Sequence, residues 1–488
     1  MASSTYSLNF LDLPAELLVE ISSYLDSPTI LASVCKDLSN MIHSTPSLWS
    51  CVSVGERQHS ADDVVFLRNH LERGKSCPLH VSIRATGSLK KEMKSEFEIW
   101  STLSTHEGRI CSLIISTDTL VLSGIILCEV LLTPLPVILP RLRKLDVRHN
   151  EGSLLPIVLQ SAHPLVLFEP IPSMFPSLTT LVLAHLDPCI PNISAPLLSL
   201  ETLILDGSMS WSCDSAGLYR VVQLLEMAPR LETLWLKDHQ LYTGHDVRPI
   251  SVLRPDMCSA AAPIQCPVVL PRLTRLAVTA PGFGVDLLHT IAAPLLQDLH
   301  LDAIRDEGYF GEASWTETYL QMLCASLRLL AVRSPGLRRL ALLGIYLTRA
   351  TWEWLFGCAQ GEVPFPLLES IALREIAAEQ ADMRNVVDNS LLEMYAKVGR
   401  ISLRRFAYLA SEPLLSGVAL CRLAELFVEK RADGAFELEI DGETSDEVKE
   451  HLGLLPVGLQ TILHSEPFRR KEWWTLGQGI DPTERDSY

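Results

Sequence analysis

Basic residues are scarce in this sequence. Its 488 residues include 41 Lys and Arg against 58 Asp and Glu, so the formal net charge is −17. Proteins that bind nucleic acid broadly rely on clustered Lys and Arg to neutralise phosphates. We therefore expect no nucleic-acid partner.

Closely spaced cysteines are also lacking. The closest pair among the twelve cysteines is Cys258 and Cys266, and no Cys/His cluster has the spacing of a zinc site. The first residues lack the basic region and long apolar core of a secretion signal. These observations favour reduced thiols and a cytoplasmic or nuclear location.

An uninterrupted membrane span is absent as well. The longest apolar run extends from Leu120 to Leu139, and it contains Glu129, Pro134 and Pro136. A span needs about 20 apolar residues, and a carboxylate near its centre is costly. A buried helix ending near residue 133, followed by an extended proline segment, explains the run, so we expect no membrane partner.

Patterns typical of enzymes are missing. The sequence has no nucleophile elbow and no metal cluster, and Gly282-Phe-Gly284 lacks the third glycine of a dinucleotide-binding loop. We therefore predict that the chain is not an enzyme and uses no cofactor.

What the sequence has in abundance is one repeated phrase: a proline, a spacer, then Leu-x-x-Leu-x-aliphatic. Its Leu-x-Leu end alternates with period two, as a short strand does. The stretches between phrases are long enough for a helix, so successive strands should lie parallel in one curved sheet. An ordinary α/β domain with a leucine-rich core is the alternative, but eight copies favour a stacked array. The copies begin at Pro140, Pro176, Pro196, Pro229, Pro271, Pro294, Pro335 and Pro366.

The phrase resembles an irregular leucine-rich repeat. The asparagine or cysteine that this family places three residues after the last leucine is not regularly present; Asn150 is the only asparagine there. The resemblance implies an α/β fold, a right-handed solenoid with a curved parallel sheet, less regular than the family norm.

The first fifty residues follow another pattern. Leu13-Pro14 opens an amphipathic helix, and Ser27-Pro28 opens a second one. A third short apolar group precedes Trp49. Three helices in about 40 residues bury little surface of their own, so we expect a partner. The apolar stripe of the second helix comprises Ile30, Leu31, Val34 and Leu38.

This segment resembles an F-box. The resemblance implies that it docks a Skp-type adaptor and, through it, a cullin ubiquitin ligase. Two features depart from the family: Leu38 stands where a tryptophan is usual, and the stretch between Leu25 and Val34 is about two residues short. The alternative is an amphipathic helix packed on the first repeat. The motifs that carry the resemblance are Leu13-Pro14-x-Glu16-Leu17-Leu18, Tyr24-Leu25-Asp26, Val34-Cys35-Lys36 and Pro46-x-Leu48-Trp49.

These patterns divide the chain and place its sites. We predict an F-box-like helical domain at 1–54, a connector with irregular capping repeats at 55–110, a leucine-rich-repeat-like solenoid at 111–445, and a cap with a polar tail at 446–488. Within them we expect strands at 79–84, 110–115 and 436–440, and helices at 379–398 and 414–430. The repeat leucines that we expect to be buried in register are Leu145, Leu181, Leu234, Leu276, Leu299 and Leu340. The predicted adaptor-binding residues are Leu13, Pro14, Glu16, Leu17, Leu18, Ile21, Leu25, Pro46, Leu48 and Trp49. The predicted substrate-binding residues, on the concave sheet face, are Asp146, Arg148, Trp235, Lys237, His300 and Asp302.

Among the concave residues, Trp235 is the predicted anchor, because a large aromatic on an open sheet exposes apolar area. The alternative is that the loop at residues 239–269 covers Trp235. The resemblance implies a substrate receptor of a Skp-cullin-F-box type ubiquitin ligase, whose substrate is an unknown protein. The alternative is a repeat scaffold or protein-binding module that acts outside ubiquitination.

Overall fold

The structure is a computed structural model. The chain divides into two compact parts, residues 1–337 and 338–488. The residues that it describes are 13, 17, 21, 28–54, 61–85, 99, 101–117, 139–149, 175–184, 197–206, 215–237, 267–279, 281–302, 317–343, 346–347, 354–355, 365–374, 377–378, 400–404 and 437–440.

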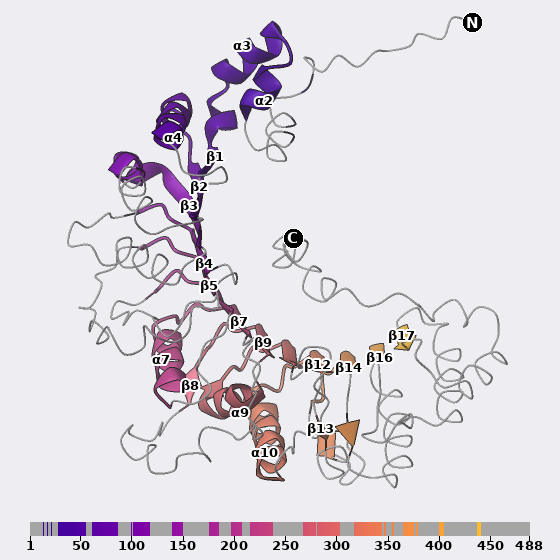
Figure 1. Ribbon diagram of the computed structural model, residues 1–488. Helices are drawn as coiled ribbons and strands as arrows, with labels where there is room; N and C mark the ends of the chain where they lie inside the picture. Colours follow the sequence, from indigo (N-terminus) through magenta and orange to yellow (C-terminus); the bar gives the residue numbers. More distant parts are fainter. Residues whose placement is uncertain are drawn as a thin grey trace, which may run out of the picture. The chain divides into compact units, whose positions relative to one another are not determined.

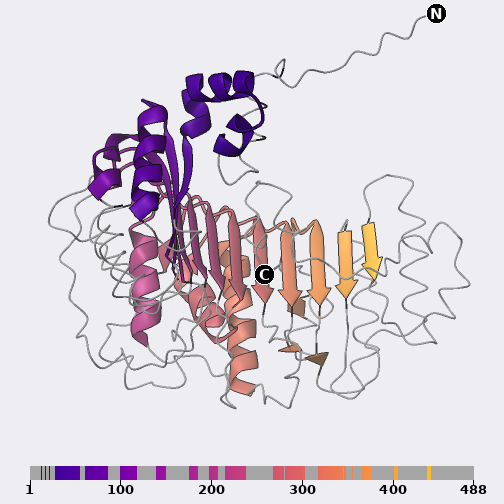
Figure 2. The same cartoon turned by 45° about the horizontal axis from the view of Figure 1, so that its top comes forward.

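A parallel sheet forms the centre of the first part (Figures 1 and 2). Nine strands of it lie in the described residues, in the order β1-β2-β3-β4-β5-β6-β7-β9-β11. Their bounds are β1 Cys51–Val54, β2 Leu79–Ala85, β3 Ile110–Thr117, β4 Lys144–His149, β5 Thr180–Ala184, β6 Thr202–Asp206, β7 Thr233–Lys237, β9 Arg275–Thr279 and β11 Asp298–Asp302. Each repeated phrase of this part thus contributes one strand, as predicted.

The leucines of successive phrases lie in register. Leu145 pairs with Leu181, and the row continues through Leu203 and Leu234. Leu276 and Leu299 extend it. All six side chains are at most 4% exposed. The predicted burial of five of them is therefore confirmed, and Leu203, which was not predicted, joins the same row. The row forms a continuous core that no single repeat could form alone.

Helices connect several strands and lie on one side of this sheet (Figure 1). α4 (Ala61–Arg73) connects β1 to β2, α7 (Ser215–Glu226) connects β6 to β7, and α9 (Pro281–Thr290) connects β9 to β11. α10 (Glu317–Arg333) packs against α9. These connections have the predicted strand-helix form. Smaller elements are η3 (Glu107–Arg109) and a two-stranded sheet of β8 (Val268–Val269) and β10 (Ile291–Ala292).

Serine hydroxyls join successive turns of the array. Ser177 Oγ donates to the carbonyl oxygen of Pro140, and Ser199 Oγ donates to that of Pro176, each at 2.7 Å. Each bond gives a backbone carbonyl of a turn a hydrogen-bond donor from the next repeat, in place of water. These two bonds join three successive repeats.

In the described residues of the second part, four parallel strands pair in one sheet. They are β12 (Arg339–Leu343), β14 (Ser370–Arg374), β16 (Arg400–Arg404) and β17 (Glu437–Ile440). β13 (Tyr346–Leu347) and β15 (Ala377–Ala378) form a separate parallel pair. The strands predicted at the last two phrases and near residue 436 are confirmed, whereas β16 was not predicted.

A helical module precedes the first strand. It comprises α2 (Pro28–Ala32), α3 (Lys36–Ser44) and the 3₁₀ turn η2 (Pro46–Trp49), and Leu17 and Ile21 before them are also helical. The Sγ of Cys35 caps α3 by accepting from the N–H of Leu38 at 3.4 Å. The module core consists of Leu31, Leu38, Ile42, Leu48 and Trp49, with Leu13, Ile21, Ala32 and Met41 packed against it.

The array begins earlier than the sequence indicates. Only Ser50 separates η2 from β1, and β1 pairs with β2 from Cys51 onward. The strands predicted at 79–84 and 110–115 in the connector are β2 and β3 of the main sheet. The helical module therefore continues directly into the sheet.

Several predictions lie outside the described residues. They include the helices predicted at 379–398 and 414–430, the polar tail, and most of the apolar run before Pro140. Among the residues that the structure describes, no helix is long and apolar enough to cross a membrane.

Candidate functional site

Trp49 lies at the junction between the helical module and α4. Its side chain is fully buried, and its Nε1 donates to the carbonyl oxygen of Ile42 at 2.9 Å. His43 stacks on its ring with centroids 5.6 Å apart, and His70 of α4 meets it edge-on at 4.7 Å. The Arg73 guanidinium lies 4.5 Å from the ring centroid. Residues of the module and of the first connecting helix thus share one packed cluster.

This burial corrects part of the predicted adaptor-binding set. Leu48 is 2% exposed and Trp49 is 0% exposed, so both side chains support the module core and are not presented to a partner. Removing these apolar side chains from water contributes favourable free energy to the folding of the module. Pro46 is half-buried. The predicted residues Pro14, Glu16, Leu18 and Leu25 lie outside the described part of the chain.

Three apolar side chains of the module do face solvent. Leu17 and Ile30 are each 43% exposed, and Val34 is 70% exposed. Ile30 and Val34 were predicted to share a buried stripe with Leu31 and Leu38. The structure separates them, because α2 ends at residue 32 and α3 begins at residue 36.

The break between α2 and α3 has a local cause. Ser33 Oγ donates to the carbonyl oxygen of Ile30 at 2.6 Å, and Cys35 caps the next helix. Short polar side chains of this kind compete with helical hydrogen bonding and favour caps. The Ser33-Val34-Cys35 sequence before Asp37 was the signal that could have located these two exposed residues.

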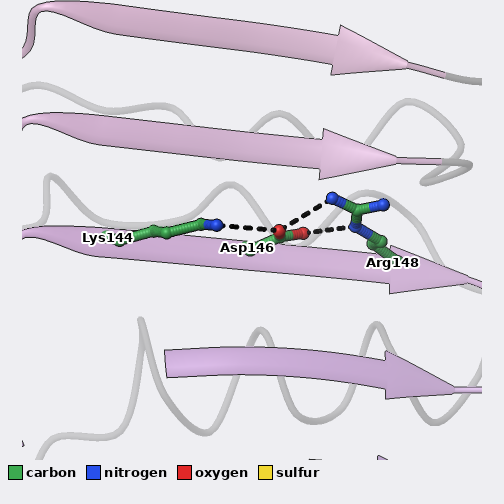
Figure 3. A network of polar contacts seen from close by, with 3 residues as sticks. All are labelled: Lys144, Asp146 and Arg148. Atoms are coloured by element: carbon green, nitrogen blue, oxygen red, sulfur yellow. Dashed lines mark hydrogen bonds and ion pairs between the residues drawn. The ribbon is translucent and has the colours of Figure 1, made fainter. Parts of the chain in front are cut away.

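A charged cluster occupies the face of β4 (Figure 3). Asp146 is only 1% exposed. Arg148 donates two hydrogen bonds to its carboxylate, from Nε to Oδ1 at 2.7 Å and from Nη2 to Oδ2 at 2.9 Å. Lys144 Nζ lies 3.8 Å from Oδ2. The hydrogen bond to Asp146 raises the pKa of Arg148, and the charge of Asp206 acts in the same direction. The predicted residues Asp146 and Arg148 are therefore in direct contact.

The residues between the core leucines form one row across the sheet. The register runs from Asp146 through Val182, Ile204, Trp235 and Ala277 to His300. This confirms that they share a row, but Trp235 and His300 lie two strands apart. Lys237 and Asp302 follow in β7 and β11, and their side chains lie outside the described set.

The prediction that Trp235 exposes a large apolar area is wrong. Its side chain is 9% exposed, and its neighbours Ile204 and Ala277 are 8% and 0% exposed. Strands of a sheet lie about 4.8 Å apart, so in-register neighbours cover the flanks of a side chain. Asp146 is buried in the same row, whereas His300 is half-buried.

The described residues show no group of three His, Cys, Asp or Glu side chains that could hold a metal ion. The cysteines that the structure describes, Cys35, Cys51, Cys77, Cys111 and Cys324, are free. The described residues also include exposed apolar groups on the module and partly exposed cations on β4.

Comparison with known families bears on the helical module. Residues 10–54 match the F-box-like family model. The matched segment covers the described helices and ends at the last residue of β1, so we call the module F-box-like from here on. The resemblance of the repeats to leucine-rich repeats rests on their strand pattern. No curated protein matches the chain.

Burial of His70 predicts that this junction loses stability in acid. Desolvation lowers its pKa to about 4; the hydrogen bond to the Phe66 carbonyl opposes this shift, and the charge of Arg73 adds to it. An unfolded histidine titrates near 6.5, so it binds a proton at a pH where the folded residue does not. The stabilisation is complete above about pH 6.5 and is lost as the pH falls towards 4, by up to about 3 kcal/mol.

Hydrogen exchange of peptides from α3, η2 and α4, followed between pH 7 and 4.5, measures this loss after correction for the intrinsic exchange rate. A His70→Phe variant serves as the control, because it keeps a ring at this position and cannot titrate. Its exchange should depend less on pH than that of the wild type. The same pH dependence in both proteins would exclude His70 as the cause.

Proposed function

We propose that the chain is a substrate-recruiting subunit of a Skp-cullin-F-box type ubiquitin ligase. The F-box-like module docks a Skp-type adaptor, and the sheet of repeats binds a protein substrate. The observation that carries this proposal is the exposure of Leu17, Ile30 and Val34 on a module that matches the F-box-like family model.

The exposed apolar residues serve no evident purpose within the module. Its core is already closed by side chains that are at most 9% exposed, from Leu31 to Trp49. Burying apolar area in an interface contributes roughly 25 cal/mol for each Å² removed from water. A partner that covers Ile30 and Val34 would gain this energy without rearranging the core.

The repeats support the second half of the proposal. Their parallel strands stack side by side in one continuous sheet, and proteins built of stacked repeats commonly bind partners along the stack. On β4, Lys144 and Arg148 retain side-chain exposures of 33% and 28% although both contact Asp146. Cations held in fixed positions can select a partner by its charge.

The proposed mechanism is proximity. Ubiquitin transfer is carried out by other subunits, and this chain raises the effective concentration of substrate lysines near them. No catalytic group is required of this chain, in keeping with the prediction that it is not an enzyme.

We expect the double substitution Ile30→Glu/Val34→Glu to weaken the affinity for a Skp-type adaptor by at least about tenfold. The reason is that carboxylates buried in an apolar interface lose their hydration. The measurement is the dissociation constant of the purified full chain for the adaptor. The matched control is Val332→Glu, since Val332 is 80% exposed on α10 of the repeats. Full affinity in the double variant, or an equal loss in the control, would refute the assignment of this surface.

A further inference from the structure

The face of the main sheet opposite the leucine core differs in exposure between its two ends. In the row that contains Trp235, the side chains from β4 to β9 are nearly closed to solvent; Ile204 is 8% exposed and Ala277 is 0% exposed. The row continues onto the earlier strands through Ile114 of β3 and Ser82 of β2, and both of these are half-buried. The open part of this row therefore lies on β2 and β3.

Cations stand on both sides of this open part. Arg84 of β2 is in register with Ser116 of β3, which is in register with Arg148 of β4. Lys144 lies four residues before Arg148 on β4 and belongs to the same face (Figure 3). Because neighbouring strands lie about 4.8 Å apart, the backbones of Arg84 and Arg148 are roughly 10 Å apart. We call Arg84, Lys144 and Arg148, together with Ile114 of the strand between them, the cationic face.

The cationic face keeps an excess of positive charge after its own carboxylate is counted. Asp146 accepts two hydrogen bonds from Arg148, and Lys144 Nζ lies 3.8 Å from the same carboxylate. Arg84 is half-buried, and in the part of the chain that the structure describes its guanidinium forms no ion pair. Three cations against one carboxylate leave two positive charges over β2 to β4, in a chain whose net charge is −17.

Two neighbouring titratable groups border the cationic face without cancelling this excess. The pKa of Arg148 is raised first by its hydrogen bond to Asp146 and also by the charge of Asp206, which lies on β6, two strands beyond β4. Asp206 therefore acts at the Arg148 side of the face, and Arg84 is two strands further away. Burial lowers the pKa of His80 on β2, so this histidine is neutral at pH 7 and adds no charge.

The middle of the cationic face is apolar. Ile114 is half-buried, so part of its side chain is still in contact with water. An apolar side chain of a partner that packs on it would remove that area from water, which favours association. Arginine around an apolar centre is also the composition that protein interfaces favour. The face thus suits a segment that carries an apolar residue between acidic ones.

We propose that the cationic face binds an acidic segment of a partner protein, in which carboxylates flank an apolar residue. The carboxylates pair with Arg84 and Lys144, and the apolar side chain packs on Ile114. Guanidinium groups bind carboxylates through charge-assisted hydrogen bonds, and a lysine adds a point charge. A nucleic-acid backbone is a poorer fit, because it is held through many Lys and Arg contacts.

The identification of this partner with the substrate rests on the proposed function, whereas the binding itself does not. If both hold, the substrate occupies the strands next to the F-box-like module, since β1 follows η2 directly and pairs with β2. This moves the substrate site several strands towards the adaptor from the predicted anchor Trp235 on β7.

The test uses the full chain and a fluorescein-labelled peptide in which glutamates stand on both sides of a leucine. A peptide with glutamine in place of glutamate is the neutral control. Fluorescence anisotropy should show binding of the acidic peptide only, with an affinity that falls as NaCl is added. The double variant Arg84→Gln/Lys144→Gln should bind the acidic peptide at least about tenfold more weakly. Arg148 is left in place, because its removal would leave the buried Asp146 without its partner.

Two further variants separate local charge from net charge and folding. Arg84→Lys/Lys144→Arg keeps both charges and should retain most of the salt-dependent binding. Arg230→Gln/Arg272→Gln removes two exposed arginines from the turns before β7 and β9, which is the same change in net charge, and should leave the affinity within about twofold of the wild type. Thermal melting of each variant checks its fold. If Arg84→Gln/Lys144→Gln fails to fold, the comparison of the two peptides on the wild type decides the matter.

The proposal is overturned if the wild type binds both peptides equally or neither, or if Arg230→Gln/Arg272→Gln weakens binding as much as Arg84→Gln/Lys144→Gln does. Displacement of the peptide by a single-stranded oligonucleotide that binds more tightly would overturn it as well. Adaptor capture is measured on the same proteins. Peptide binding without adaptor capture would refute the proposed function and leave the cationic face supported, whereas adaptor capture without peptide binding would refute the cationic face alone.

Discussion

Replacing Trp49 with alanine is expected to unfold the F-box-like module while the sheet of the second part stays intact. Removing a fully buried aromatic side chain typically costs about 3 to 5 kcal/mol. Here the loss includes the hydrogen bond to Ile42 and the contacts with His43, His70 and Arg73. A module of this size has little stability in reserve. Hydrogen exchange should show loss of protection in α2 and α3, and adaptor capture should disappear.

Two controls accompany this substitution. Trp49→Phe keeps an aromatic ring and should retain most of the protection. Trp354→Ala removes a tryptophan of the second part that meets Phe365 edge-on, and it should leave α2 and α3 protected. Undiminished protection and adaptor capture in Trp49→Ala would show that the buried ring does not support the module.

Replacing Arg148 with methionine is expected to destabilise the sheet by about 3 kcal/mol, because it leaves the carboxylate of Asp146 buried without its bidentate partner. Lys144, at 3.8 Å, can compensate only in part. Burial of an unpaired charge costs more than the loss of the pair as a whole. The measurement is the free energy of unfolding from urea titration, followed by exchange of peptides from β3 to β5.

The double variant Asp146→Leu/Arg148→Met tests the stated cause. It removes both charges and keeps apolar volume, so it should recover most of the stability lost in the single variant. Equal losses in the single and double variants would mean that packing of the Arg148 stem, and not the unpaired carboxylate, sets the cost.

The strands were predictable because their signal is local. The Leu-x-Leu alternation of phrases such as that ending at Leu234 and Leu236 identifies a strand within a few residues. The rule that consecutive strands with long connections lie parallel then gives the sheet order. β1 was not predicted, because Cys51–Val54 is short and directly follows a 3₁₀ turn.

The sites were harder to predict because burial depends on distant residues. Trp235 is in register with Ile204 and Ala277, which lie 31 positions before it and 42 positions after it in the chain. Trp49 is enclosed partly by α4, which sequence spacing alone does not bring to it. The sequence did place Asp146 and Arg148 on one face, but their ion pair depends on side-chain conformations that spacing does not specify.

The single residue between η2 and β1 has a consequence for distance. With only Ser50 as a joint and Trp49 packed on α4, the module has no linker through which it could swing away from the first strand. Neighbouring strands lie about 4.8 Å apart, so β4 lies roughly 14 Å from β1 and β11 roughly 38 Å from β1, counted from strand to strand across the sheet. Under the proposed function, the strand on which a substrate binds would therefore set its distance from the adaptor bound to the F-box-like module.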